Sequence, residues 1–383
     1  MTLLPLILGM LAAFAPLAID MYLPALPAMA ADLAGDAAGA QKTVAAYFLG
    51  VALGQLVYGP LTDRLGRRGP LFVGVGVFVA ASLACAWAAD MPQMIALRFL
   101  QALGGCAGMV VTRAVVRDLA DRIDPVTLMG RLMLVMGVAP ILAPLLGTLV
   151  AAWFGWRGIF VFLALFGALA AVMVVWLLPE THAPERRIRR SLREIMADYA
   201  GLLADRRFTA PALAGSGAIA GMFAYIAGSP AVFMGVHGIG PEAYAIWFGV
   251  NAAAVIGGGQ LAGPLAARIG AVRLFGWALL AMLALTLAHL GAVLAGTHFL
   301  VQFALLFGYL AVLGVVLPLG SVLTLQHFPR LAGTASALFG TMQFGLGGVA
   351  GVALGLLQNG SAWPMAAVIL GCIILAGGSW LRR

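Results

Sequence analysis

The stretch "YGPLTDRLGRRGP", residues 58 to 70, sets one acid, three arginines and three glycines between two long apolar runs. Part of it returns later in the chain: "GQLVYGPLTDRLGRR" (54–68) aligns with "GQLAGPLAARIGAVR" (259–273) when one gap is allowed at Tyr58. In this alignment Arg64 corresponds to Arg268, and Gly66 corresponds to Gly270. A repeat in corresponding places of a chain predicts two similar halves.

The composition indicates an integral membrane protein. Of the 383 residues, 63% are hydrophobic and 9% are charged, and the mean hydropathy is +1.04, whereas about one quarter of the residues of a soluble domain are charged. The three cysteines, Cys85, Cys106 and Cys372, lie in apolar stretches without a Cys-x-x-Cys pair. They indicate neither a disulfide framework nor a metal site.

Apolar runs long enough to cross a bilayer, about 20 residues each, recur along the whole chain. The predicted spans are 4–26, 42–62, 70–89, 93–116, 128–152, 157–178, 209–236, 243–265, 271–292, 298–320, 331–357 and 362–381. The first could be read as a signal peptide because "PAMAAD" (27–32) resembles a cleavage site. No basic side chain precedes it and Asp20 interrupts it, so we expect a retained helix.

The distribution of basic residues predicts the orientation. Apart from Lys42, Arg98, Arg113 and Arg157, every Lys and Arg falls in alternate connections or at the C-terminus. The positive-inside rule then places both termini in the cytoplasm. Because the net charge of +8 is spread over all these connections rather than along one face, a nucleic-acid partner is not indicated.

The spans divide into two six-helix bundles, 1–178 and 209–383, joined by a cytoplasmic linker at 179–208. The linker contains "PETHAPERRIRRSLREIMADYAGLLADRR" (179–207), the longest polar stretch of the chain. Its arginines can lie against anionic headgroups. We interpret it as a partly helical, solvated connector, with a regulatory site as the alternative.

Several stretches together carry a family resemblance. "GPLTDRLGRR" (59–68) matches the loop signature G-x-L-x-D-R-x-G-R-R of the major facilitator superfamily. "DMYLPALP" (20–27), "RFLQALGGCAGMVVTRAVVRDL" (98–119) and "GTASALFGTMQFGLGG" (333–348) resemble its bicyclomycin/chloramphenicol resistance (Bcr/CflA) branch. The resemblance implies an all-α fold of twelve spans in two pseudo-symmetric six-helix bundles. It also implies drug:proton antiport driven by the proton gradient, without another cofactor.

The loop signature has a physical rationale of its own. Its arginines hold the end of the second span at the membrane surface, and its acid can pair with an Arg in one conformation and separate in another. The resemblance implies a cytoplasmic gate that meets the start of the eleventh span near 331–336. A simple topology anchor is the alternative. The residues of this gate motif are Gly59, Asp63, Arg64, Gly66, Arg67 and Arg68, with Asp118 as the partner expected for Arg64 or Arg67.

The fifth span departs from the family pattern. Antiporters of this group carry G-x-x-x-G-P-x-x-G-G there, and this chain has Ala139, Ala143-Pro144, Gly147 and Thr148 in the defined places. Alanine still permits close helix packing. The departure keeps a proton-coupled uptake symporter of the same fold as an alternative to antiport.

Among the charged residues that are not assigned to a connection, three fall inside predicted spans: Asp20, Arg98 and Arg113. Such residues normally face a partner or a water-filled cavity. Asp20 and Arg98 each lie about 8–9 Å on the outer side of the midplane, at about 1.5 Å per residue, so they are at a depth where they can reach one another, directly or through water. The resemblance implicates both in proton coupling; a static ion pair is the alternative. Arg113 suits either a substrate contact or a surface anchor.

Other polar side chains are candidates for a central cavity. Those on the second and fourth spans recur at helical spacing, although interhelical hydrogen bonds are an equally good explanation. The candidate cavity residues are Tyr22, Tyr47, Gln55, Gln101, Arg113, Tyr225, Asn251 and Gln343.

The sequence therefore predicts a proton-coupled efflux transporter for small amphipathic or hydrophobic compounds. It contains no P-loop, no His-Glu-x-x-His and no cluster of acids, so neither an enzyme nor a metal site is expected. We expect a monomer in the inner membrane of a bacterium, with drug-like molecules, protons and lipid as its partners. A non-transporting sensor or scaffold is the more distant alternative.

Overall fold

The computed structural model describes residues 4–119, 125–182 and 191–382. The chain forms two compact units. Unit 1 comprises Met1–Asp36 and Ala46–Ile195, and unit 2 comprises Ala37–Ala45 and Met196–Arg383. The chain passes from unit 1 to unit 2 inside the predicted linker, of which residues 183–190 lie outside the described residues. The exact bundle boundaries stay a prediction.

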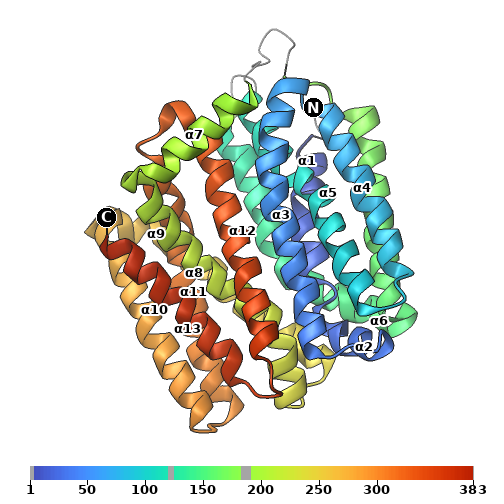
Figure 1. The fold of residues 1–383 in the computed structure, drawn as a ribbon, viewed down its shortest axis with the longest axis vertical. Coiled ribbons are helices and arrows are strands. Elements are labelled where there is room, and N and C mark those ends of the chain that lie inside the picture. Colours follow the sequence, from blue (N-terminus) through green and yellow to red (C-terminus); the bar gives the residue numbers. More distant parts are fainter. Residues whose placement is uncertain (1–3, 120–124, 183–190, 383) are drawn as a thin grey trace. The chain divides into compact units, whose positions relative to one another are not determined.

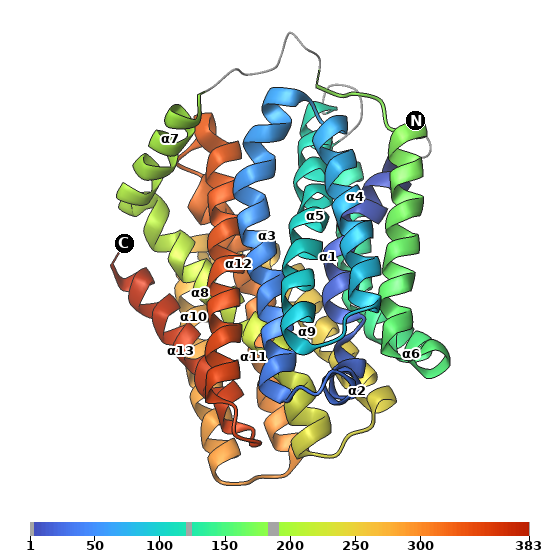
Figure 2. The same cartoon turned by 45° about the vertical axis from the view of Figure 1, so that its right-hand side comes forward.

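Unit 1 consists of helices that pack side by side (Figures 1 and 2). In it α5 packs against both α4 and α1, and α6 packs against α1 and α4. The helix α5 begins where the Asp90 carboxylate accepts the backbone N–H of Gln93 at 2.8 Å, a side-chain cap. The elements are α1 (Leu4–Asp20), η1 (Leu23–Ala25), α2 (Leu26–Asp32), α3 (Ala37–Leu65), α4 (Arg68–Ala86), α5 (Met91–Asp118), α6 (Pro125–Leu177) and α7 (Leu192–Ala204), of which α3 and α7 extend into unit 2.

Unit 2 repeats the same plan. Its helix α11 packs against α9, α10 and α8, while α8 also packs against α12 and α13. One row of helices, α9, α11 and α10, thus lies against a second row formed by α12, α8 and α13. The elements are α8 (Arg206–Pro230), the π-helix η3 (Ala231–Val236), α9 (Pro241–Ile269), α10 (Ala271–Leu294), α11 (Phe299–Leu325), η4 (Pro329–Leu331), α12 (Ala332–Leu357) and α13 (Trp363–Leu381).

The twelve predicted spans correspond to these helices, with one merger. Residues 128–152 and, apart from residue 178, the span 157–178 fall in the single element α6, which contains a non-helical residue, Gly155, with φ of +66°. By length and apolar composition, the described residues offer eleven helical segments that could cross a membrane, and Val135–Leu177 is long enough to cross twice. The predicted all-α membrane fold is confirmed.

The internal repeat has a backbone explanation. Gly66 separates α3 from α4 with φ of +93°, and Gly270 separates α9 from α10 with φ of +85°. Both lie in the left-handed region, which only glycine adopts without strain. The aligned glycines of the two copies therefore both supply a positive φ between consecutive spans.

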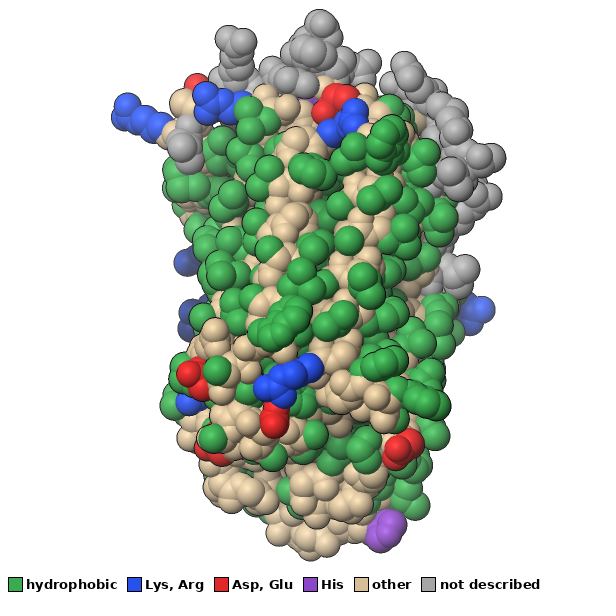
Figure 3. Space-filling model, turned by 90° about the vertical axis from the view of Figure 1, so that its right-hand side faces the viewer, with side chains coloured by type: hydrophobic (Ala, Val, Ile, Leu, Met, Phe, Trp, Pro, Cys, Tyr) green, Lys and Arg blue, Asp and Glu red, His purple; other side chains and the backbone are tan. Residues whose placement is uncertain are grey.

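The surface is apolar where a membrane protein requires it. Large side chains of α6 are exposed, among them Leu165 at 66% and Trp176 at 80%. Figure 3 shows hydrophobic side chains covering most of one face, with many charged side chains toward its two ends. In water such a surface would be unfavourable, since contiguous exposed apolar patches on soluble proteins are small. In a bilayer it faces hydrocarbon.

Candidate functional site

Arg67 is the centre of a polar cluster at the junction of α3 and α4. Its side chain is 1% exposed and donates to Asp118 through Nε at 2.8 Å and through Nη2 at 3.2 Å. Its Nη1 donates to Asp63 at 2.6 Å and to Thr62 at 3.2 Å. This two-pronged contact with one carboxylate is the geometry that suits guanidinium best. Arg64 and Arg67 were the two partners predicted for Asp118, and Arg67 is the one that forms the ion pair.

The charge of Arg67 is stabilised by these contacts. Burial lowers the pKa of the guanidinium, but the hydrogen bonds to Asp118 and Asp63 outweigh it and hold the pKa above its usual value. Arg67 therefore stays charged at any physiological pH. A buried charge of this kind is tolerated because it is paired and because each of its three side-chain nitrogens donates a hydrogen bond.

Glu180 is a member of the cluster that the sequence did not reveal. Its carboxylate accepts the backbone N–H of Arg67 at 2.9 and 3.1 Å and that of Arg68 at 3.2 Å. These are unpaired donors at the start of α4, where a negative charge is favourable. Thr181 adds a hydrogen bond to Asp118 at 3.2 Å. "PETH" (179–182), interpreted as the start of a solvated linker, is thus bound to the gate motif.

The rest of the gate motif surrounds this cluster. Arg68 donates to the carbonyl oxygen of Val175 at 2.6 Å, and Gly59 accepts the hydroxyl of Thr62 through its carbonyl at 3.1 Å. Arg64 is exposed. The contact expected between this loop and residues 331–336 stays a prediction.

A second buried arginine, Arg98, lies within α5 and is fully buried. It donates to Oε1 of Gln101 at 2.5 Å and to the carbonyl oxygen of Ala18 at 2.8 Å. The guanidinium also stacks over the rings of Tyr22 at 4.2 Å and Tyr47 at 4.4 Å. Aromatic faces attract cations, most strongly where water is excluded.

Asp20 ends α1 close to this arginine and is 4% exposed. Its Oδ1 has no hydrogen-bond partner among the described residues. Nor do these residues include an ion pair between Asp20 and Arg98, because their ion pairs involve Arg67, Arg117 and Arg157. Arg98 instead donates a hydrogen bond to the carbonyl oxygen of Ala18. The static ion pair considered as an alternative is therefore not formed in this structure.

Tyr47 of α3 packs against the guanidinium of Arg98 through its ring. Its hydroxyl is buried without a hydrogen-bond partner among the described residues. Gln101 extends the cluster by donating to Ser82 on α4 at 2.8 Å. Tertiary structure thus brings candidates from α1, α3 and α5 together.

The fifth-span motif packs directly beside Asp20. A Cβ added to Gly147 would lie 1.7 Å from the carbonyl oxygen of Met21, a distance no side chain can occupy. The α6 backbone therefore contacts the chain one residue after Asp20. Ala143 is fully buried, and Pro144 accepts the hydroxyl of Thr148 at 2.9 Å. Gly147 is the glycine of the family pattern that this chain keeps, and the contact with Met21 requires a glycine at this position.

The remaining cavity candidates are divided between the two units. Gln55 is buried in α3, and its Nε2 has no partner among the described residues. In unit 2 Asn251 donates to the hydroxyl of Tyr225 at 3.0 Å, and Gln343 is half-buried. Arg113 is exposed on α5. Their role in a cavity stays a prediction.

The comparisons with known proteins agree with this architecture. A family model described as the Major Facilitator Superfamily matches residues 8–352. The chain belongs to the major facilitator superfamily. It is accordingly a multi-pass membrane transporter rather than an enzyme, and its bacterial relatives place it in the plasma membrane. The orientation of its termini stays a prediction.

Individual relatives within the superfamily support the resemblance to its drug-resistance branch. The chain is 33% identical to an uncharacterized MFS-type transporter, YdgK, of Bacillus subtilis, covering 95% of this chain and 90% of the relative. It is 28% identical to a bicyclomycin resistance protein homolog of Haemophilus influenzae, covering 96% and 93%. It is 32% identical to a chloramphenicol resistance protein of Pseudomonas aeruginosa, covering 94% and 85%.

A solved structure supports the superfamily fold. The crystal structure of a D-xylose-proton symporter superposes with a TM-score of 0.76, covering 98% of this chain and 96% of that one. At 16% sequence identity the likeness concerns the fold alone.

Proposed function

We propose that this transporter exports small amphipathic or hydrophobic compounds, drugs among them, in exchange for protons. The names of two relatives, a bicyclomycin resistance protein homolog and a chloramphenicol resistance protein, favour drug efflux. The observation that carries the proposal is the state of Asp20, an acid buried in a membrane-spanning segment whose Oδ1 has no partner among the described residues. A buried ionisable group in a transporter normally marks an ion or substrate pathway.

In this proposal Asp20 carries the proton. Because Oδ1 accepts no hydrogen bond from the described residues, it can take up a proton without breaking an existing bond. Arg98 is held by Gln101 and the Ala18 carbonyl, so its position does not depend on the charge of Asp20. A fixed positive charge nearby stabilises the carboxylate after the proton has left.

The proposed cycle couples this proton to the exported compound. Asp20 takes up a proton from the outside and releases it inward, and the compound enters the cavity while Asp20 is charged. The proton-motive force supplies the energy, about 2.3 kcal/mol per charge per 100 mV. No further cofactor is required, and we expect the transporter to act as a monomer.

The test is transport by Asp20→Asn in everted membrane vesicles with an imposed pH gradient and chloramphenicol as the probe. We expect the variant to fold normally and to lose pH-driven transport down to the level of empty vesicles, while still equilibrating the probe down its own gradient. Asp90→Asn is the matched control: it removes an exposed acid at the start of α5, and asparagine still caps the helix. It should transport like the unaltered protein.

The outcome also separates the alternatives. Full pH-driven transport by Asp20→Asn would show that this acid does not couple the proton. A proton-coupled symporter would move the probe in the same direction as the protons, whereas the antiporter moves it in the opposite direction. Symport remains an alternative because the fifth-span motif departs from the pattern of the antiporters.

A further inference from the structure

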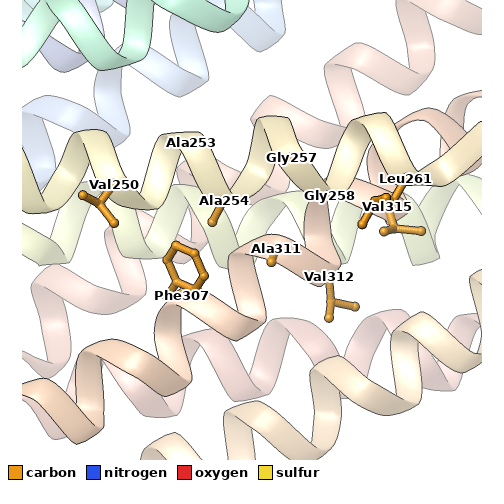
Figure 4. Close-up of a pocket in the computed structure, with 10 residues that line it drawn as sticks. All are labelled: Val250, Ala253, Ala254, Gly257, Gly258, Leu261, Phe307, Ala311, Val312 and Val315. Atoms are coloured by element: carbon orange, nitrogen blue, oxygen red, sulfur yellow. The ribbon is translucent and has the colours of Figure 1, made fainter.

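A groove of about 520 Å³ runs along unit 2 between α9 and α11 (Figure 4). Val250 and Phe307 line one end, and Leu261 and Val315 line the other, with Gly257 and Ala311 between them. Every side chain that lines it is apolar. From Val250 to Leu261 the groove follows α9 for about 16 Å, at about 1.5 Å per residue.

Glycines create the groove by bringing the two helices into direct backbone contact. A Cβ added to Gly258 would lie 1.9 Å from the carbonyl oxygen of Ala311, and one added to Gly314 would lie 2.1 Å from that of Val255. The helices thus touch along one line, and the small side chains beside it leave a furrow. Close approach of this kind requires residues without side chains.

The groove opens on the side of α9 and α11 that faces away from α8. Asn251 of α9 is bonded to Tyr225 of α8, and Tyr309 of α11 donates to Ala218 of α8 at 3.3 Å. These contacts fix one side of each helix against α8. Gly257 and Leu261 are exposed on another side, midway along a helix that is long and apolar enough to cross a membrane.

A basic side chain continues the same stripe to the end of the helix. Arg268 follows Leu261 by seven residues and Gly257 by eleven, so the three share one face of α9. It is exposed and lies about 10 Å beyond Leu261 along the axis, at about 1.5 Å per residue. Among the described residues, the arginines in ion pairs are Arg67, Arg117 and Arg157. The charge of Arg268 is therefore not neutralised by a described acid.

We propose that this groove binds an acyl chain of an anionic phospholipid whose phosphate is held by Arg268. The apolar furrow suits a hydrocarbon chain, and the guanidinium lies at the end of the span, where headgroups begin. Arginine binds phosphate through paired N–H donors. Both features are needed. The apolar groove binds the acyl chain, and the charge of Arg268 favours an anionic headgroup.

The experiment uses the full protein in phosphatidylcholine nanodiscs that contain a little phosphatidylglycerol with a photoreactive acyl chain. Labelled positions are mapped by mass spectrometry. We expect the label to concentrate on the α9 and α11 residues of the groove. Gly257→Phe should abolish this labelling, because a Cβ there meets no atom within 4 Å and the ring would fill the groove. Arg268→Gln should weaken it about fivefold, the effect of one basic residue near a charged surface.

Gly263→Phe is the matched control. It adds the same ring to the same helix, also with no atom within 4 Å of the Cβ, but outside the groove, and should leave the labelling unchanged. Photoreactive phosphatidylcholine should label the groove of Arg268→Gln as it labels that of the unaltered protein. The proposal is overturned if the groove is labelled no more than other exposed helix surfaces, or if Gly263→Phe acts like Gly257→Phe. Displacement of the label by chloramphenicol would identify the occupant as transported compound and would also overturn it.

Discussion

Arg67 and Arg98 are both buried in unit 1, yet they are accommodated in opposite ways. Arg67 is held by the carboxylates of Asp63 and Asp118. Among the described residues Arg98 has neutral partners, the amide of Gln101 and the carbonyl oxygen of Ala18, together with three aromatic rings. The acid near Arg98, Asp20, is left unpaired by it. The first arrangement cancels charge, whereas the second leaves the charge of Arg98 without a counter-charge among the described residues.

This difference indicates two different tasks. A neutralised, hydrogen-bonded cluster fixes structure, here the turn between α3 and α4 and the end of α6. An arginine whose hydrogen-bond partners are neutral keeps its positive charge unneutralised. We therefore expect stability to depend more on Arg67 and proton coupling more on Arg98.

The largest effect on stability is expected for Arg67→Met. Removing the guanidinium leaves Asp63 and Asp118 without their shared counter-charge, and breaking a buried pair costs about 3–5 kcal/mol. Thermal unfolding of the purified protein in detergent measures this loss. Arg64→Met, which removes an exposed arginine of the same loop, is the control. If both variants melt at the same temperature, the Arg67 cluster is not structural.

A smaller loss of stability is expected for Arg98→Lys. Lysine keeps the charge but cannot reach Gln101 and Ala18 together with one planar group, and it loses the stacking on both tyrosines, at a cost of about 1–2 kcal/mol. Transport driven by a pH gradient should fall much further than stability does.

Tyr47→Phe sharpens this result because it keeps the ring and removes a hydroxyl that has no described partner. The melting temperature of Tyr47→Phe should stay unchanged.

The comparison of the two arginines has its own test. If Arg98→Lys destabilises the protein as much as Arg67→Met, the two arginines have the same structural role, and the distinction between them is wrong.

The smallest effect is expected for Arg157→Gln, an arginine paired at the surface. Arg157 contacts Asp32, and its guanidinium lies 4.2 Å from the ring of Trp156, but both members of the ion pair are about half exposed. Water and salt weaken such pairs. Its melting temperature in physiological salt should match that of the unaltered protein. A loss comparable to that of Arg67→Met would mean that burial does not decide the strength of these pairs.

The sequence alone led to the membrane fold, the internal repeat and the gate motif. Apolar runs of spanning length are a strong local signal, and the glycines at 66 and 270 mark turns that require positive φ. The pairing of Asp118 with an arginine of the motif was also predicted. The choice of Arg67 over Arg64 was not, because it depends on which side of the α3 end faces α5.

Other parts of the site have no signal in the sequence. Glu180 follows a long apolar run and resembles any acid at the start of a linker, and its role depends on the end of α6 lying beside the start of α4. The contact of Gly147 with Met21 joins residues far apart in the chain. The neutral partners of Arg98 include a backbone carbonyl oxygen, which no sequence pattern identifies.

The amino-acid sequence by itself determined that this chain crosses the membrane repeatedly in two related halves, because hydrophobic length and glycine turns act locally. It also singled out Asp20 and Arg98, since charges are rare in hydrocarbon. Only the tertiary structure decided that these two residues form no ion pair and that Arg67, Asp118 and Glu180 share one cluster. Pairing of buried charges depends on distances of a few ångströms between side chains on different helices, and helix packing alone sets those distances.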